Sequence, residues 1–133
     1  MDAITSQIAQ RGLDAAREFA VARRLAVSIS VVDGRGDLLA MLRLDGAPWY
    51  TAIVSRGKAA AAAAFGVTSG DLAARADSPV FRALMQLGDG IIPQAGAVPI
   101  FVRDQLVGAI GVSGASSQDD EQIAMAGALA VRI

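Results

Sequence analysis

One stretch constrains the fold of this chain more than any other: apolar residues dominate positions 107–113, and a polar segment follows at 115–121. Since apolar side chains fall on both faces of a strand there, the first segment predicts a strand buried on both sides. Ser117 and Asp120 have the spacing of a helix cap, a short polar side chain followed three residues later by an acid. The stretch therefore predicts a buried strand that passes through a tight turn into a helix.

Glycines interrupt this strand and its turn at positions 108, 111 and 114. A glycine lets another backbone or a ligand come close, and the N-terminus of the following helix is electropositive. We therefore expect a ligand site at the junction of strand and helix, with Gly111, Ser113 and Gly114 as candidate binding residues.

The composition fits one compact domain spanning 1–133, because 53% of the residues are hydrophobic and 19% are charged. A net charge of −1, with one Trp, one Tyr and four Phe, argues against a nucleic-acid partner. The sequence shows neither an apolar stretch long enough for a bilayer nor a signal-peptide pattern. We therefore expect no membrane association and a location in a bacterial-type cytoplasm.

The chain contains no histidine and no cysteine. This composition removes the commonest general base and the commonest metal ligand, and it excludes zinc sites and Ser-His-Asp triads. A hard cation would need carboxylate, carbonyl or water ligands, and a haem iron would need Tyr50, a Met, a Lys or another oxygen ligand. No residue pattern indicates a metal site.

Apolar periodicity and turn residues divide the chain into helices and strands. Helices are expected at 4–24, 49–65, 68–71, 80–87 and 118–132. Strands are expected at 27–31, 38–44, 98–102 and 106–113, with 91–94 as a candidate short strand. The order is helix, two strands, two or three helices, two or three strands and a helix. It implies a mostly antiparallel α+β sheet in a single domain.

Several short segments, in this order and spacing, also carry a family resemblance. They are 31–34 with Gly36, 43–47, Lys58–Ala59, 96–100, 108–114, Gln118–Asp119 and Ala126–Gly127. Together they resemble the GlcG/HbpS-type family, which is often labelled haem-binding or haem-degrading and includes the C-terminal domain of PduO-type cobalamin adenosyltransferases. The resemblance covers nearly the whole chain.

The resemblance implies a fold, an assembly and a ligand class. The implied fold is a five-stranded antiparallel sheet flanked by helices, similar to profilin-like domains, and the implied assembly is a homo-oligomer from dimer to octamer. Haem or a corrinoid is the implied cofactor or ligand. The chain departs from those relatives proposed to bind haem iron through a histidine, because it has none.

Two basic residues support functional hypotheses, Arg43 in an expected strand and Lys58 in an alanine-rich helix. The Arg43 guanidinium could clamp a carboxylate, or it could form an ion pair with Asp45 at the edge of the core. A partly desolvated Lys58 ammonium could move a proton or anchor an anion, or it could reach water or form a salt bridge. Arg43, Asp45 and Lys58 are therefore candidate ligand-binding residues.

Acidic residues near turns and helix starts are the other candidates. Asp33 precedes a glycine, so its carboxylate could satisfy turn amides or take part in catalysis. Asp119 stands with Asp120 and Glu121 at the start of the last helix, where negative charge suits the macrodipole. If one of these acids faces one of the two basic residues across a pocket, the pair could transfer protons on a carboxylate substrate. The candidate catalytic residues are Arg43, Lys58, Asp33 and Asp119.

These observations favour an oligomeric domain that binds a small molecule, either a tetrapyrrole or a small carboxylate. The alternative is a cofactor-independent isomerase, lyase or hydrolase acting on a small carboxylate, in which Arg43 orients the substrate and Lys58 with an acid moves protons. A third possibility is an assembly module without a ligand. The binding domain is preferred because the strongest signals identify a scaffold, and a fold does not determine a function.

Overall fold

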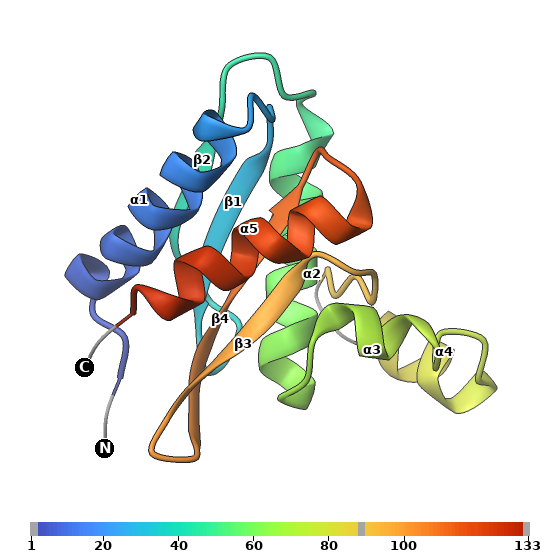
Figure 1. Ribbon diagram of the computed structural model, residues 1–133. Helices are drawn as coiled ribbons and strands as arrows, with labels where there is room; N and C mark the ends of the chain where they lie inside the picture. The colour runs from blue at the N-terminus through green and yellow to red at the C-terminus, as the bar shows by residue number, and fades with distance from the viewer. Residues whose placement is uncertain (1–2, 88–89, 132–133) are drawn as a thin grey trace.

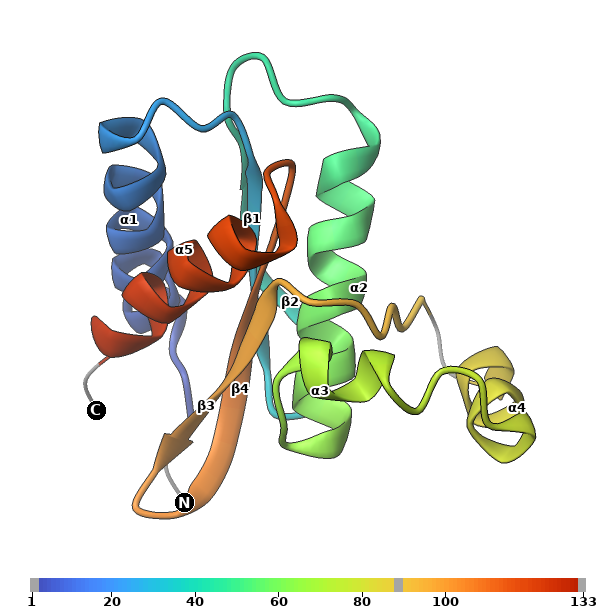
Figure 2. The same cartoon turned by 45° about the vertical axis from the view of Figure 1, so that its right-hand side comes forward.

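The computed structural model describes residues 3–87 and 90–131 (Figure 1). The elements are α1 (Ser6–Ala22), β1 (Ser28–Asp33), β2 (Leu38–Arg43), α2 (Tyr50–Phe65), α3 (Ser69–Ala73), α4 (Pro79–Leu87), β3 (Ala97–Val102), β4 (Gln105–Ser113) and α5 (Ser117–Leu129). The strands form an antiparallel sheet in the order β2-β1-β4-β3. Helices α1 and α5 cover one face of this sheet and α2 covers the other (Figure 2). The expected antiparallel α+β fold is confirmed.

The sheet has four strands in the part of the chain that the structure describes, so the expected fifth strand is wrong. The candidate strand 91–94 lies against α2 instead, where the backbone N–H of Ile92 donates to the carbonyl oxygen of Gly57 at 3.0 Å. Gly57 permits this approach, because a Cβ there would lie 2.6 Å from the carbonyl oxygen of Gly90. The segment therefore follows the outside of a helix and does not extend the sheet.

The two faces of the sheet differ in the size and polarity of their side chains. Large aliphatic side chains, including Ile29 and Ile110, face α1 and α5 and form the main core. Ser28 and Ser30 face α2 and are fully buried, with hydrogen bonds of 2.7 Å to the hydroxyls of Thr51 and Ser55 respectively. The alternation of serine with aliphatic residues in β1 thus separates a large apolar layer from a thin, partly polar one.

Small residues bring α2 unusually close to the sheet. A Cβ at Gly111 of β4 would overlap the backbone carbonyl of Ser55 and the backbone nitrogen of Ala59. Ala59 packs on this face in a small cluster of buried, mostly alanine side chains. The glycine in this strand therefore serves the close approach of another backbone, one of the two roles expected for it.

Most predicted helix ends lie within two residues of the observed ones: α1, expected at 4–24, is Ser6–Ala22, and α3, expected at 68–71, ends at Ala73. Gly66 ends α2 in the left-handed conformation, with a φ of 66°, and the Thr68 side chain caps α3 by accepting from the N–H of Asp71. Ser116, and not Ser117, caps α5 by accepting from the N–H of Asp119 at 3.1 Å. The expected extension of this helix is wrong at 130 and 131, because α5 ends at Leu129; residue 132 lies outside the described residues.

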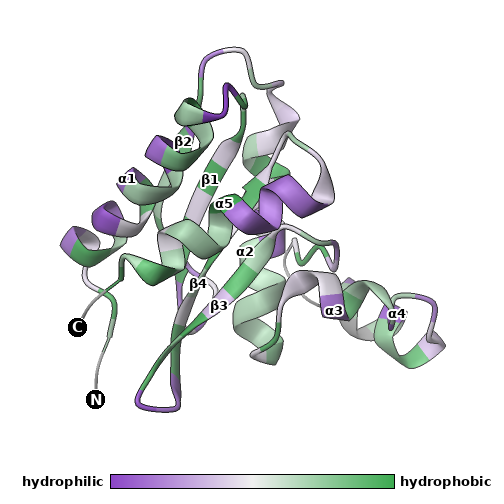
Figure 3. Cartoon of the chain, in the orientation of Figure 1, coloured by the Kyte–Doolittle hydropathy of each residue, from purple (hydrophilic) through white to green (hydrophobic). Residues whose placement is uncertain are grey.

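The helices differ in hydropathy along their length. Figure 3 shows hydrophilic first turns in α5 and a more hydrophobic end, and alternating hydrophilic and hydrophobic stretches along α1. Within residues 3–87 and 90–131, no helix combines the length and the apolar character needed to cross a bilayer. The hydrophilic start of α5 contains Asp120, which is buried, whereas Asp119 and Glu121 are partly exposed.

Candidate functional site

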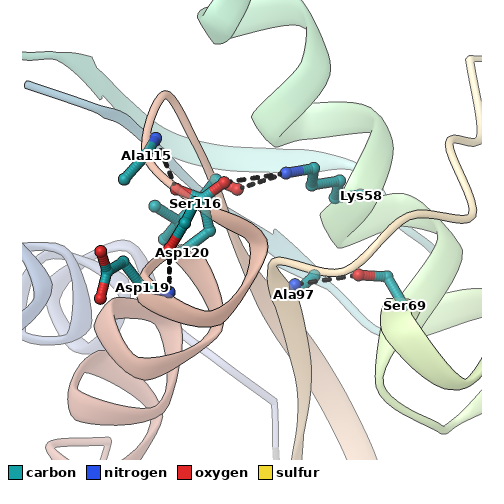
Figure 4. A network of polar contacts seen from close by, with 8 residues as sticks. Lys58, Ser69, Ala97, Ala115, Ser116, Asp119 and Asp120 are labelled. Carbon is teal, nitrogen blue, oxygen red and sulfur yellow. Dashed lines mark hydrogen bonds and ion pairs between the residues drawn. The ribbon is translucent and has the colours of Figure 1, made fainter.

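Lys58 projects from α2 toward the end of β4 and is buried, with 6% of its side chain exposed. Its Nζ donates to the carbonyl oxygen of Val112 at 3.0 Å and to Oδ2 of Asp120 at 3.2 Å (Figure 4). The Asp120 side chain is 3% exposed. The pair therefore joins α2, β4 and α5 through an ion pair that is shielded from solvent.

Asp120 is held by both of its carboxylate oxygens. Its Oδ1 accepts from the backbone N–H of Ala115 at 2.9 Å, in the turn between β4 and α5. Burial raises the pKa of Asp120 above its ordinary value of 3.8, while the hydrogen bond from Ala115 and the charge of Lys58 oppose that rise. Asp120 thus acts as a cross-link between the turn and α2.

Gly96 closes the other side of the pair. It has a φ of 137°, and a Cβ at this position would lie 2.7 Å from Nζ of Lys58. Its carbonyl oxygen accepts from the N–H of Val112 at 2.8 Å. Among the described residues, no buried side-chain nitrogen or oxygen lacks a hydrogen-bond partner. The geometry indicates a structural role for Lys58 and Asp120, since both charges are already paired within the fold.

A cavity of about 310 Å³ lies on the outer side of α2, away from the buried pair. We call it the α2 groove. One wall is the turn between β1 and β2, and the other is the segment that follows α4. Its lining consists of Arg35, Gly36, Asp37, Ile53, Arg56, Gly57, Ala60, Ala64, Gly90 and Ile91.

The α2 groove combines two cations with a floor of small residues. Arg35 and Arg56 are exposed, and among the described residues Asp37 is the one acid in the lining. Nε of Arg35 lies 3.8 Å from Oδ2 of Asp37 in a solvent-exposed pair, which is a weak interaction. The groove therefore carries an excess of positive charge beside the aliphatic side chain of Ile53, a combination suited to a ligand with an apolar body and an anionic group.

Asp33 shapes the turn that forms one wall of this groove. Its Oδ1 accepts from the backbone N–H of Arg35 at 2.9 Å and of Asp37 at 3.0 Å. The N–H of Gly36, which has a φ of 88°, donates to the carbonyl oxygen of Asp33 at 2.9 Å. The carboxylate therefore satisfies turn amides, as one of the two hypotheses for Asp33 proposed.

The structure separates Asp33 from Arg43. Arg43 pairs with Ser28 at the opposite end of β1, so Asp33 lies about 17 Å away along the strand at the usual rise per residue. The Arg43 side chain is exposed, and its Nη1 donates to the carbonyl oxygen of Ala47 at 3.2 Å. Asp45 is exposed in the same loop. These residues do not line the α2 groove.

The remaining predicted residues surround the end of β4. Ser113 is 8% exposed and lies in one cross-strand row with Ser28 and Arg43. A Cβ at Gly114, whose φ is 132°, would lie 2.7 Å from the carbonyl oxygen of Ala26. Asp119 is partly exposed and contributes its backbone N–H to the helix cap. The acid that meets Lys58 is therefore Asp120, one residue further along the chain.

Sequence reasoning did not identify the residues of the α2 groove. The helical wall of the groove consists of Ile53, Gly57, Ala60 and Ala64. The last three recur at helical spacing and could have been recognised as a strip of small residues on one face of the helix. Nothing in the sequence indicated that the turn carrying Arg35 would lie against this strip. In the described ranges, no group of three or more His, Cys, Asp or Glu residues is placed to hold a metal ion.

Comparison with known proteins identifies one family. The family model described as "Haem degrading protein HbpS-like" matches residues 4–129. Comparison with the curated proteins gives no match.

Solved structures share the fold over nearly the whole chain. HbpS from Streptomyces reticuli, crystallised as a double variant, has a TM-score of 0.89 and 30% identity, covering 100% of this chain and 90% of that chain. The ORFY protein of Klebsiella pneumoniae has a TM-score of 0.88 and 27% identity, covering 98% and 92%. PduOC, solved as a complex with heme, has a TM-score of 0.88 and 22% identity, covering 98% and 96%. At 22% identity, the likeness to PduOC concerns the fold alone.

Proposed function

The chain belongs to the HbpS-like family, and we propose that it binds a tetrapyrrole at the α2 groove. The observation that carries this proposal is the pair of guanidinium groups, Arg35 and Arg56, that flank an aliphatic wall in one cavity. A tetrapyrrole such as haem combines a large apolar ring with carboxylate groups, and guanidinium groups bind carboxylates through charge-assisted hydrogen bonds. The description of the family as haem-degrading and the heme complex of PduOC support this ligand class.

The size of the α2 groove defines how such a ligand sits. Its volume of about 310 Å³ lies at the lower end of the range of about 300–1,000 Å³ for small-molecule sites. A groove of this size would hold the carboxylate groups of a tetrapyrrole, with Arg35 and Arg56 as their partners. Ile53 supplies apolar contact there, with 61% of its surface exposed.

The residues around the groove fit a haem, although the chain has no histidine. Tyr50 lies one helical turn before Ile53 and is 51% exposed, so its phenol oxygen is available on the same side of α2. A tyrosine oxygen is an established type of haem-iron ligand. A bound haem would supply redox-active iron, Arg35 and Arg56 would hold its carboxylates, and Tyr50 would be the candidate ligand of its metal.

The test is a titration of the purified protein with haemin, followed at the Soret band. Saturable binding is expected, with weaker binding for Arg35→Ala and Arg56→Ala and an altered spectrum with retained binding for Tyr50→Phe. Arg11→Ala is the matched control, because Arg11 is exposed on α1 and outside the groove. Equal loss of affinity in the control, or no saturable binding by the wild type, would refute the proposal.

Thermal-shift measurements with small carboxylates and cobalamins distinguish the ligand classes. Stabilisation by a ligand that binds the native state grows with its concentration over its dissociation constant. Stabilisation by haemin and not by simple carboxylates supports the tetrapyrrole. The enzymatic alternative stays a prediction. The pairing of Lys58 with Asp120 in a buried contact and the hydrogen bond of Arg43 to the carbonyl oxygen of Ala47 give it no support.

A further inference from the structure

The two cations of the α2 groove differ in their partners within the protein. Arg35 lies in the turn between β1 and β2, and its Nε is 3.8 Å from Oδ2 of Asp37. Arg56 lies on α2 and forms no ion pair within residues 3–87 and 90–131. A ligand therefore reaches the Arg56 guanidinium without displacing a carboxylate of these residues, whereas at Arg35 it has a competitor.

The competitor, Asp37, is held at the groove by its backbone. Its N–H donates to Oδ1 of Asp33 at 3.0 Å, and its carbonyl oxygen accepts from the N–H of Asp33 at 2.9 Å. The turn lies against α2 at Gly36, where a Cβ would be 3.6 Å from Cα of Ala60. The Asp37 carboxylate accepts none of these hydrogen bonds, so its charge can be removed without opening the turn.

The charge of Asp37 affects any anion that approaches Arg35. A ligand carboxylate and the Asp37 carboxylate would share one guanidinium, and like charges at such a distance repel each other. The side chains of Arg35 and Asp37 are 88% and 65% exposed, so water and salt screen this repulsion. The expected effect is a change in preference among anionic ligands and not a block to binding.

We propose that Asp37, through its pair with Arg35, determines which anionic ligands the α2 groove accepts, by disfavouring those with many carboxylates. The inference rests on the proposed tetrapyrrole site and adds a specificity-determining residue to it. A first carboxylate binds Arg56, and a further carboxylate near Arg35 meets the charge of Asp37. The groove then selects tetrapyrroles with few carboxylates over those with more.

Two ligands with the same metal test this selection. Haemin carries two carboxylates, and iron coproporphyrin carries four on a ring of the same size. Soret titrations of the wild type and of Asp37→Asn measure the dissociation constant for each ligand. Because an exposed ion pair contributes little, Asp37→Asn is expected to bind haemin about two- to fivefold more tightly, with a larger gain for iron coproporphyrin.

The matched control is Asp71→Asn, which makes the same change of net charge. Asp71 is exposed on α3 and does not line the α2 groove. This variant should bind both ligands with the wild-type affinities. Circular dichroism establishes that each variant is folded.

A double-mutant cycle tests whether Asp37 acts through Arg35. If it does, Asp37→Asn should improve binding less in the Arg35→Ala background than in the wild type, because the guanidinium that it frees is then missing. The same improvement in both backgrounds would overturn this part of the proposal.

The titrations separate failure of this inference from failure of the proposed function. Absence of saturable haemin binding by the wild type would refute the tetrapyrrole site itself. Saturable binding by the wild type, with no gain for Asp37→Asn, an equal gain for the two ligands, or the same gain for Asp71→Asn, would overturn the role of Asp37 alone.

Discussion

Arg56 and Lys58 are two residues apart on α2 and have opposite environments. Arg56 is exposed and lines the α2 groove, whereas Lys58 is buried with its charge paired to Asp120. Two residues rotate the side-chain direction by about 200° around a helix with 3.6 residues per turn. Two neighbouring basic residues of one helix therefore place one cation in solvent and the other in the interior.

The difference shows why a charge in a helix says little about function until its face is known. The buried Lys58 ammonium is hydrogen-bonded to Val112 and Asp120, so its removal should lower the free energy of unfolding. The outward cation has little to stabilise within the fold and is free for a ligand. Variants on the two sides of α2 should therefore separate loss of stability from loss of binding.

The largest expected effect comes from breaking the buried pair. Lys58→Met leaves the Asp120 carboxylate buried without its cation, and removal of one partner from such a pair typically costs about 3–5 kcal/mol. We expect the free energy of unfolding, measured by urea denaturation, to fall by about that amount. Asp120→Asn should have a similar effect, since it leaves the Lys58 ammonium buried without a carboxylate.

The double variant Lys58→Met with Asp120→Asn sharpens this test. Because neither residue is then charged, the double variant should lose less stability than the sum of the single variants. Additive losses would show that the two side chains are not coupled, and they would contradict the close contact between Nζ of Lys58 and Oδ2 of Asp120.

The next effect concerns the contact between α2 and the sheet. Gly111→Ala places a Cβ against the backbone of α2, and overpacking of this kind costs about 1–3 kcal/mol. Gly34→Ala is the control, because its nearest neighbour would be the carbonyl oxygen of Leu106 at 3.7 Å. Thermal denaturation should show a lower midpoint for the first variant alone. Equal shifts would mean that the loss arises from chain flexibility and not from packing.

The sequence predicted most of this fold because its signals were local. The apolar run ending at Ser113, the alternating serines of β1, and the caps at Thr68 and Gly66 depend on residues adjacent in the chain. The segment 91–94 was misjudged because its backbone partner is Gly57, which lies far away in sequence. A short apolar segment reveals its composition but not the element that it packs against.

The site was harder to predict than the fold, for the same reason. For Lys58 the sequence left open a role toward a ligand, contact with water and a salt bridge, and the structure pairs it with Asp120, whereas Asp119 was the acid named as a catalytic candidate. One residue at the start of a helix turns an acid by about 100°. Asp33 was assigned two possible roles, and its hydrogen bonds from the N–H groups of Arg35 and Asp37 support the role in the turn.

A smaller effect follows from the raised pKa of Asp120. Because burial raises the folded-state pKa above 3.8, the folded state binds the proton more tightly than the unfolded state. The contribution of this group is greatest below its unfolded pKa and is lost as pH rises through the folded pKa, by at most about 1.4 kcal/mol per pH unit. Urea denaturation of the wild type and of Asp120→Asn from about pH 4 to pH 7 measures it as the difference between the two curves. A difference that grew with pH would indicate a lowered pKa.

The smallest expected effect on stability is that of Arg56→Ala, which tests the outward side of α2. An exposed side chain away from buried networks typically changes the free energy of unfolding by less than about 0.5 kcal/mol, so urea denaturation should match the wild type. Loss of a charge-assisted hydrogen bond of about 1.5–3 kcal/mol should nevertheless weaken haemin binding by about tenfold to a hundredfold. A variant that lost stability and kept its affinity would reverse the assignment of the two faces, because it would make Arg56 a structural cation like Lys58.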